Sequence, residues 1–345
     1  MIETETVRNT TQATRPPPRI GFAGVGRIGR RRLEAILESG CAEVTAIYDP
    51  VSGASDSAVQ LAPKASVARS FDEMLALDLD GVAIATPNAL HAPQALAALL
   101  RNKAVFCQKP LGRDATETRE IIAVARETNR LLHVDLSYRF TSGLQRIRQL
   151  IRSGALGRIY AVEAVFHNAY GPDRAWFYDA QQSGGGCLLD LGIHLVDLTL
   201  WCLDYPQVNN VVGHLLNREP APPDRAHRVE DYAAAQLLLG NGASVQLACS
   251  WHAPAGCDAE IRVTFFGSGG GATFANVDGS FFDFTALQFR PDRSRHTLVS
   301  PPDAWGGRAA VEWCRRLRQS AGFDPEIEHL GTVAETLDRI YGRLT

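Results

Sequence analysis

Three glycines near the amino terminus restrict the fold of this chain more than any other feature. A short apolar segment, residues 19–23, runs into a G-x-G-x-x-G pattern and then into a helical segment. The first glycine permits a tight turn, the second lets backbone N–H groups approach a pyrophosphate, and the third lets the helix lie against the strand. The positive end of that helix then faces the phosphates. The pattern predicts a dinucleotide site formed by Gly24, Val25, Gly26, Arg27, Ile28 and Gly29.

An acidic residue at the end of the next predicted strand supports this interpretation. Asp49 follows residues 43–48 and lies twenty positions beyond Gly29, a spacing that suits a carboxylate accepting hydrogen bonds from the adenosine ribose. Its charge disfavours a 2′-phosphate, and no Arg or Lys occurs in residues 50–53, so the sequence favours NAD over NADP. Arginines elsewhere leave NADP open. A simple turn aspartate before Pro50 is the alternative.

The arrangement of predicted elements divides the chain. Strands and helices alternate from Arg19 to Asp135, which predicts a parallel, doubly wound sheet. After Tyr138, segments of period-two alternation follow, with an Asn241-Gly242 hairpin turn. We predict a flexible tail over 1–18, a Rossmann domain over 19–138 and an α+β domain over 139–345. The second domain is expected to hold an open, mostly antiparallel sheet that binds substrate and mediates assembly into a homodimer or homotetramer.

Composition excludes several classes of protein. The formal net charge of -3 gives no electrostatic reason to expect nucleic acid or an anionic membrane as a partner. No uninterrupted apolar run approaches the roughly 20 residues of a membrane-spanning helix. The seven cysteines are scattered and form no C-x-x-C pair, so we expect neither a disulfide framework nor a metal site. Without a secretory signal, the sequence predicts a cytoplasmic protein.

Lys109 is the first candidate for chemistry. It follows the predicted strand 104–107 and precedes Pro110, so it lies at the carboxyl edge of the sheet, where ligands bind in open α/β folds. An ammonium there can donate to a substrate oxygen and stabilise charge that develops as hydride leaves the carbon. The alternative is a solvated surface lysine.

A second candidate pair follows a run of three glycines. Asp190 and His194 are spaced i, i+4 after Gly184-Gly185-Gly186, so on a helix both side chains face the same cleft. The imidazole suits a general base that removes a hydroxyl proton, and Asp190 can bind a hydroxyl or orient Lys109. A structural pair or half of a metal site is the alternative, although no further metal ligands are evident nearby.

These motifs together resemble the Gfo/Idh/MocA family (glucose–fructose oxidoreductase, inositol dehydrogenase and rhizopine catabolism). The resemblance covers the chain from about Arg19 onward, and its carriers are residues 24–29, 86–91, 108–110, 138–140 and 184–194. It implies NAD(P)-dependent oxidation or reduction of a sugar, cyclitol or related polyol, with Lys109, Asp190 and His194 as the catalytic group. It also implies that Asn88 and His91 lie near the nicotinamide and its ribose. The cofactor side of the site then comprises Thr86, Pro87, Asn88, His91, Gln108 and Lys109.

One residue departs from the family pattern. The family usually has glutamate before the lysine, whereas this chain has Gln108. Glutamine keeps a hydrogen-bond acceptor but loses the negative charge, so we expect Lys109 to have one counter-ion fewer and the pH optimum to be shifted.

Further polar and aromatic residues are predicted at strand or loop ends on the substrate side. They are Tyr138, Arg139, His167 and Trp176, which join Lys109, Asp190 and His194 as candidate substrate contacts. The leading hypothesis is a dehydrogenase of a secondary alcohol. One alternative keeps NAD tightly bound and uses transient oxidation for elimination or epimerisation. Another is a non-enzymatic protein that senses NAD(P).

Overall fold

Six parallel strands form the first sheet, in the order β3-β2-β1-β4-β5-β6. The computed structural model describes residues 15–219 and 229–343. The strands are β1 (Arg19–Ala23), β2 (Glu43–Tyr48), β3 (Ser66–Val67), β4 (Gly81–Ile84), β5 (Ala104–Cys107) and β6 (Leu132–Val134). The strand order reverses between β1 and β4, and ligands bind outside the carboxyl ends of strands at such a point. The predicted doubly wound sheet is confirmed.

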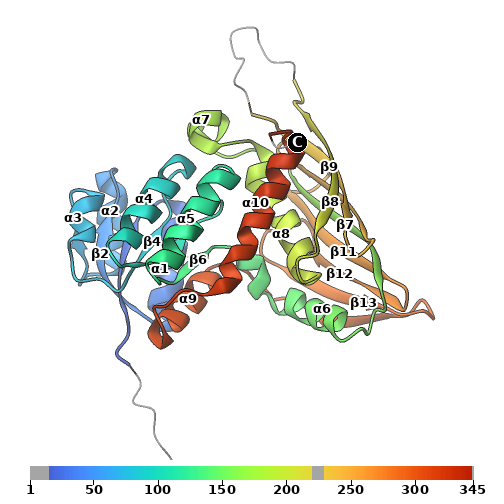
Figure 1. Ribbon diagram of the computed structural model, residues 1–345, viewed down its shortest axis with the longest axis horizontal. Helices are drawn as coiled ribbons and strands as arrows, with labels where there is room; N and C mark the ends of the chain where they lie inside the picture. Colours follow the sequence, from blue (N-terminus) through green and yellow to red (C-terminus); the bar gives the residue numbers. More distant parts are fainter. Residues whose placement is uncertain (1–14, 220–228, 344–345) are drawn as a thin grey trace, which may run out of the picture.

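Helices cover both faces of this sheet (Figure 1). They are α1 (Arg27–Ser39), α2 (Ser52–Leu61), α3 (Phe71–Leu75), α4 (Asn88–Leu100) and α5 (Ala115–Glu127). The sheet residues alternate between two cores: Val82 and Ile84 pack with the α4 and α5 side, whereas Ala83 and Phe106 pack with the α1 side. Strands buried on both faces explain the continuous apolar runs in the sequence.

Eight strands form the second sheet, in the order β14-β13-β12-β11-β7-β10-β9-β8. They are β7 (Ile159–Asn168), β8 (Val208–Leu216), β9 (Tyr232–Leu239), β10 (Ser244–Ser250), β11 (Ala259–Gly267), β12 (Gly270–Asn276), β13 (Phe284–Phe289) and β14 (Arg295–Val299). Within this second sheet, β7–β10 is the only parallel pair among the described strands, so the predicted mostly antiparallel sheet is confirmed. The sequence analysis missed β8, β12 and β14, whose polar or glycine-rich residues carry a weak strand signal.

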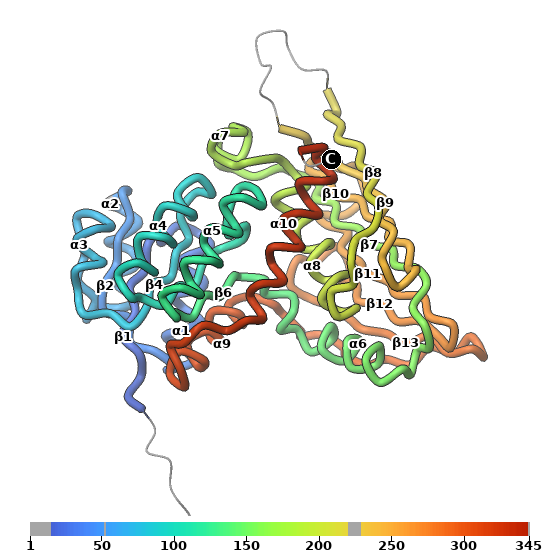
Figure 2. Tube along the Cα trace, in the orientation of Figure 1, coloured from blue at the N-terminus to red at the C-terminus, as the bar shows by residue number. Residues whose placement is uncertain are grey.

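Helices cover one face of the second sheet and leave the other open. α6 (Ser142–Arg152), α8 (Ile193–Cys202) and α10 (His329–Ile340) lie between the two sheets (Figures 1 and 2). The opposite face carries exposed apolar residues, among them Tyr160, Val212, Tyr232 and Leu238. Self-association through this face stays a prediction.

The carboxy-terminal helices change the predicted division of the chain. α9 (Arg308–Gln319) returns to α1, and its Trp313 is buried in the same core as Phe106. A simple boundary at residue 138 is therefore wrong for α9, because this helix completes the core of the first domain. The predicted tail lies outside the described residues up to position 14. Arg15 donates to Gln319 O at 3.1 Å and accepts from Arg318 Nε at 2.7 Å, so the chain is already held there.

One apolar stretch is longer than the sequence analysis allowed. Residues Ala180–Cys202 are long and apolar enough to cross a membrane by composition alone. However, 89% of the most apolar window is buried inside the protein, which is typical of a core helix.

Candidate active site

The glycine turn after β1 leaves open space in front of α1. Gly24 has φ of +85°, and a Cβ there would lie 2.6 Å from the backbone of Ala85. A Cβ on Gly29 would lie 2.1 Å from Gly24 O, whereas a Cβ on Gly26 would meet nothing within 4 Å. No side chain caps the first turn of α1, so its N–H groups face this space. Because free amides and room for phosphate occur together, residues 24–29 fit a dinucleotide.

Asp49 holds this turn in place. Its Oδ2 accepts from Val25 N at 2.8 Å, and its Oδ1 accepts from Val51 N at 2.9 Å. Each carboxylate oxygen accepts more than one hydrogen bond, so the half-buried side chain retains acceptor capacity for a ribose hydroxyl. Asp49 therefore has the structural role that its turn position suggested, and its contact with the ribose stays a prediction.

Lys109 meets Asp190 across the junction of the two domains. Lys109 Nζ donates to Asp190 Oδ1 at 2.6 Å and to Asp190 O at 2.7 Å, and the two side chains are 17% and 16% exposed. The second carboxylate oxygen accepts from Trp251 Nε1 at 3.0 Å. The carboxylate is thus held at both oxygens, while the ammonium keeps one of its three hydrogens for another acceptor.

His194 lies one turn further along the same segment. A short π-helical turn, Leu188–Gly192, leads into α8, so the pair is not on one regular helix as predicted. The His194 ring packs against Tyr138 and Phe166, with ring centroids 5.0 and 6.1 Å away. Burial, together with the charges of Lys109 and Arg32, holds the pKa of His194 well below its ordinary value. The imidazole is therefore neutral near pH 7 and can accept a proton.

A buried glutamate that the sequence analysis missed shapes the approach to this segment. Glu230 accepts from Leu188 N at 2.9 Å, from Gly186 N at 3.0 Å and from Tyr341 Oη at 2.8 Å. Burial raises the pKa of Glu230. A Cβ on Gly186 would lie 1.9 Å from Glu230 O, so glycine is required for this close approach. No local sequence pattern predicts this role of Glu230, because it contacts a segment more than forty positions away.

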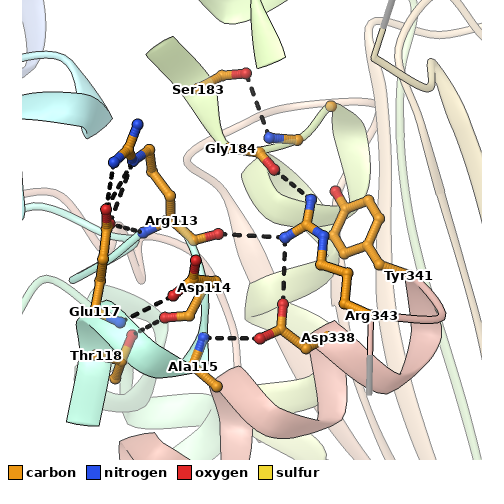
Figure 3. A network of polar contacts seen from close by, with 12 residues as sticks. Arg113, Asp114, Ala115, Glu117, Thr118, Ser183, Gly184, Asp338, Tyr341 and Arg343 are labelled. Atoms are coloured by element: carbon orange, nitrogen blue, oxygen red, sulfur yellow. Dashed lines mark hydrogen bonds and ion pairs between the residues drawn. The ribbon is translucent and has the colours of Figure 1, made fainter. Parts of the chain in front are cut away.

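The end of the chain ties the glycine run to the first domain (Figure 3). Arg343 donates to Gly184 O at 2.5 Å and to Asp338 Oδ1 at 3.2 Å, while Asp338 Oδ2 accepts from Ala115 N at 2.8 Å. Arg113 donates to Gln181 O at 2.7 Å from the same side. Two segments distant in sequence, residues 113–115 and 338–343, therefore fix the loop that precedes Asp190.

Comparisons with known proteins agree with this arrangement. Residues 18–136 match the model of an oxidoreductase family with an NAD-binding Rossmann fold, and residues 144–273 match the GFO/IDH/MocA C-terminal domain. This chain belongs to the Gfo/Idh/MocA family. D-glucoside 3-dehydrogenase of Escherichia coli (strain K12) is 27% identical, over 75% of this chain and 78% of that protein. The rhizopine catabolism protein MocA of Rhizobium meliloti is 31% identical, over 53% of this chain and 56% of that protein.

Solved structures of this family share the fold over nearly the whole chain. A 3-ketoreductase from Actinomadura kijaniata in complex with NADP and TDP-benzene gives a TM-score of 0.79 at 22% identity, over 95% of this chain and 98% of the other. Levoglucosan dehydrogenase in complex with NADH gives a TM-score of 0.80 at 21% identity, over 94% and 96% of the two chains.

Two residues expected near the cofactor, His91 and Asn88, form hydrogen bonds to backbone carbonyls of this chain. His91 is fully buried, and its ring nitrogens lie 2.6 Å from Pro110 O and 2.7 Å from Thr86 O. His91 therefore holds the backbone at Thr86 and at Pro110 in place, and its position near the nicotinamide and its ribose stays a prediction. Asn88 is also buried, and its side-chain amide donates to Ser183 O at 2.8 Å. The backbone of this segment, with the half-buried Pro87, remains a candidate cofactor wall.

The substrate candidates divide in the same way. Tyr138 is only 4% exposed and packs behind His194, so it supports the ring. Arg139 forms a buried ion pair with Asp197. His167 lies one residue after the inward-facing Phe166, bonds Ser250 Oγ at 2.8 Å and so belongs to the open face of the second sheet. Arg139 and His167 are therefore wrong as substrate contacts within one chain. Trp176 is half-buried, stacks on Phe177 at 3.8 Å and stays a candidate.

Proposed function

We propose that this chain oxidises a secondary alcohol of a sugar, amino sugar, cyclitol or related polyol, or reduces the corresponding ketone, with NAD as the cofactor. The observation that carries the proposal is the 2.6 Å contact between Lys109 and Asp190, made across the domain junction beside His194. The named activities of the relatives, which include D-glucoside 3-dehydrogenase and inositol 2-dehydrogenase, support this substrate class.

The residues present suit the proton side of such a reaction. When bound, the nicotinamide supplies the hydride acceptor or donor. The neutral imidazole of His194 takes the hydroxyl proton in oxidation and returns it in reduction. The remaining N–H of Lys109 donates to the substrate oxygen, which stabilises the charge that develops on that oxygen. Asp190 fixes the ammonium, and Trp251 fixes Asp190.

The preference for NAD rests on the pocket after β2. Asp49 accepts two backbone hydrogen bonds there and keeps its negative charge directed at the glycine turn. A 2′-phosphate beside this carboxylate is disfavoured by like-charge repulsion. The exposed Arg27 of the glycine turn lies 3.8 Å from Asp173 of the second domain.

The test is a spectrophotometric screen for NADH and NADPH formation across sugars, inositols, uronates and amino sugars, with Lys109→Met as the matched control of strongly reduced activity. We expect turnover with at least one class and preference for NAD. Stoichiometric NADH retained after purification, with no turnover of added NAD, would instead favour transient oxidation by a bound cofactor. The proposal would be contradicted if the wild type and Lys109→Met bind the cofactor equally well and neither turns over any of the substrates.

A further inference from the structure

Gln108 joins the backbone of Lys109 to a buried ion pair. Arg32 of α1 donates from Nε to Asp135 Oδ2 at 2.5 Å, and the two side chains are 3% and 0% exposed. Gln108 Nε2 donates to the same Oδ2 at 2.8 Å, and Gln108 Oε1 accepts from Lys109 N at 3.0 Å. A continuous chain of contacts therefore runs from α1 through the end of β6 to Lys109.

The two neighbours of Gln108 fix which side chain can stand there. One neighbour, the Lys109 N–H, is only a donor, and the other, the Asp135 carboxylate, is only an acceptor. An amide satisfies both in a single orientation. A glutamate would place a second carboxylate oxygen about as close to Asp135 as the amide nitrogen is, and two such groups cannot both be ionised. The glutamine that departs from the family pattern is thus matched to Asp135.

The ion pair is also linked to His194 through two aromatic side chains. The Arg32 guanidinium lies 5.1 Å from the centre of the Trp305 ring, and Trp305 packs on Tyr138 at 5.4 Å. Tyr138 in turn packs on His194. The positive charge of Arg32 contributes to the lowered pKa of His194. The network therefore contacts the backbone of Lys109 and, through Trp305 and Tyr138, the residues that pack against His194.

We propose that Gln108 is a positioning residue that anchors the Lys109 backbone to the buried Arg32–Asp135 pair, and that the negative charge of this site resides on Asp135. The proposal rests on the proposed function in one respect, namely that Lys109 acts on the substrate. The expectation that Lys109 has one counter-ion fewer than in the family stays a prediction, and Asp190 is the counter-ion that Lys109 has in this structure.

Several charged and titratable groups surround the network, among them Arg139 and Arg316, whose charges act on His133. Asp135 is faced by Arg32 from α1, by Cys107 from β5 and by His133 from β6, and it accepts a hydrogen bond from Ser137 Oγ. Lys109, with its partner Asp190, and His194, behind Tyr138, lie beyond these groups. In Gln108→Glu the two carboxyl groups must share a proton. The variant therefore loses stability relative to wild type as pH rises from about 5 to 8.

The decisive experiment transfers the negative charge from residue 135 to residue 108. Gln108→Glu and Asp135→Asn are each expected to lower kcat about 10²-fold, since a small displacement of a catalytic group has an effect of this size, with a smaller change in KM. The double variant, Gln108→Glu with Asp135→Asn, restores one carboxylate and one amide. It is expected to recover most of the lost kcat and most of the lost thermal stability, and to abolish the pH-dependent loss. Asp197→Asn, in a buried ion pair away from Lys109, is the control that lowers stability alone.

A readout without turnover separates this proposal from the proposed function. The chain has only three lysines, Lys64, Lys103 and Lys109, so acylation of each can be followed by mass spectrometry in the protein without cofactor. We expect the acylation rate of Lys109, relative to the exposed Lys64, to change at least threefold in Gln108→Glu and to return in the double variant. An unchanged rate in the single variants, or a double variant no better than the worse single one, would overturn the proposal even if the dehydrogenase activity is found.

Discussion

Asp190 and Asp197 lie in one segment of the chain, and each forms an ion pair with a basic residue that follows a strand of the Rossmann sheet. Asp190 meets Lys109 after β5, and Asp197 meets Arg139 after β6. The first pair is 17% and 16% exposed, whereas the second is 14% and 1% exposed. The same kind of contact thus occurs twice between the two parts of the chain.

The two ion pairs differ in whether the basic side chain keeps a hydrogen-bond donor for a further acceptor. Arg139 grips both oxygens of Asp197, with Nε 2.9 Å from Oδ2, and its guanidinium lies over the rings of Trp201 and Tyr205 at 5.8 and 5.7 Å. Such a fork suits a closed, structural pair. Lys109 is a point charge with a hydrogen to spare, and Trp251 occupies the far oxygen of Asp190. The comparison teaches that an ion pair between the two domains has a hydrogen available for a substrate only where its donor is left unsatisfied, and in the proposed function this donor is Lys109.

The largest effect is expected from Lys109→Met. The variant removes the donor to the substrate oxygen and should lower kcat/KM about 10³-fold, the middle of the range for a catalytic proton-handling or charge-stabilising group. The unfolding temperature should change little, because the half-buried Asp190 keeps its bond from Trp251. Arg139→Met, the matched variant of the other pair, should show the reverse pattern. Equal losses of activity in both variants would contradict the distinction.

The next effect is on stability. Asp197→Asn keeps the shape of the side chain but leaves the buried Arg139 without its counter-charge, so unfolding should become easier by about 3 kcal/mol. Chemical denaturation of the protein without cofactor measures this value. Asp190→Asn, in the more exposed pair, should cost less stability but much more activity. A larger loss of stability in Asp190→Asn than in Asp197→Asn would show that the two pairs have the same structural role.

Local patterns predicted the elements whose residues lie close together in sequence. The glycine turn, Lys109 at a strand end and the Asp190–His194 spacing each depend on a few neighbouring residues, and the parallel sheet follows from repeated strand–helix units. Contacts between distant segments left no such signal. Trp251 is 61 positions from Asp190, and Glu230 is 42 positions from Leu188.

Period-two alternation also has a limit that His167 illustrates. Alternation in β7 shows that Phe166 and His167 point to opposite faces, but it cannot tell which face the helices cover. The structure places Phe166 inside with His194 and leaves His167 on the open face. Arg139 was misjudged for a related reason, because its partner Asp197 comes from a helix whose packing the sequence does not reveal.

A smaller effect tests the part of Trp251 in the Lys109 pair. Trp251→Phe removes the indole N–H that holds Asp190 Oδ2, and hydrogen bonds to charged groups contribute about 1.5–3 kcal/mol. We therefore expect kcat/KM to fall at least about tenfold. Trp313→Phe is the matched control, since the Trp313 N–H has no partner among the described residues. Steady-state kinetics of both variants decide the matter, and equal kinetics in the two would mean that ring packing alone matters.

The smallest expected effect is a shift in the pH profile, and it separates the charge of Lys109 from its hydrogen bonds. Because burial and the charges of Lys109 and Arg32 lower the pKa of His194, wild-type kcat/KM for alcohol oxidation should decline only below about pH 6.5, the ordinary histidine value. Removing a nearby positive charge favours the imidazolium, so the residual activity of Lys109→Met should decline at a higher pH. Lys109→Arg keeps the charge and should leave the midpoint close to that of wild type. If the midpoint is the same in Lys109→Met as in wild type, then His194 is not the group that titrates, and the comparison of the two ion pairs would rest on hydrogen bonding alone.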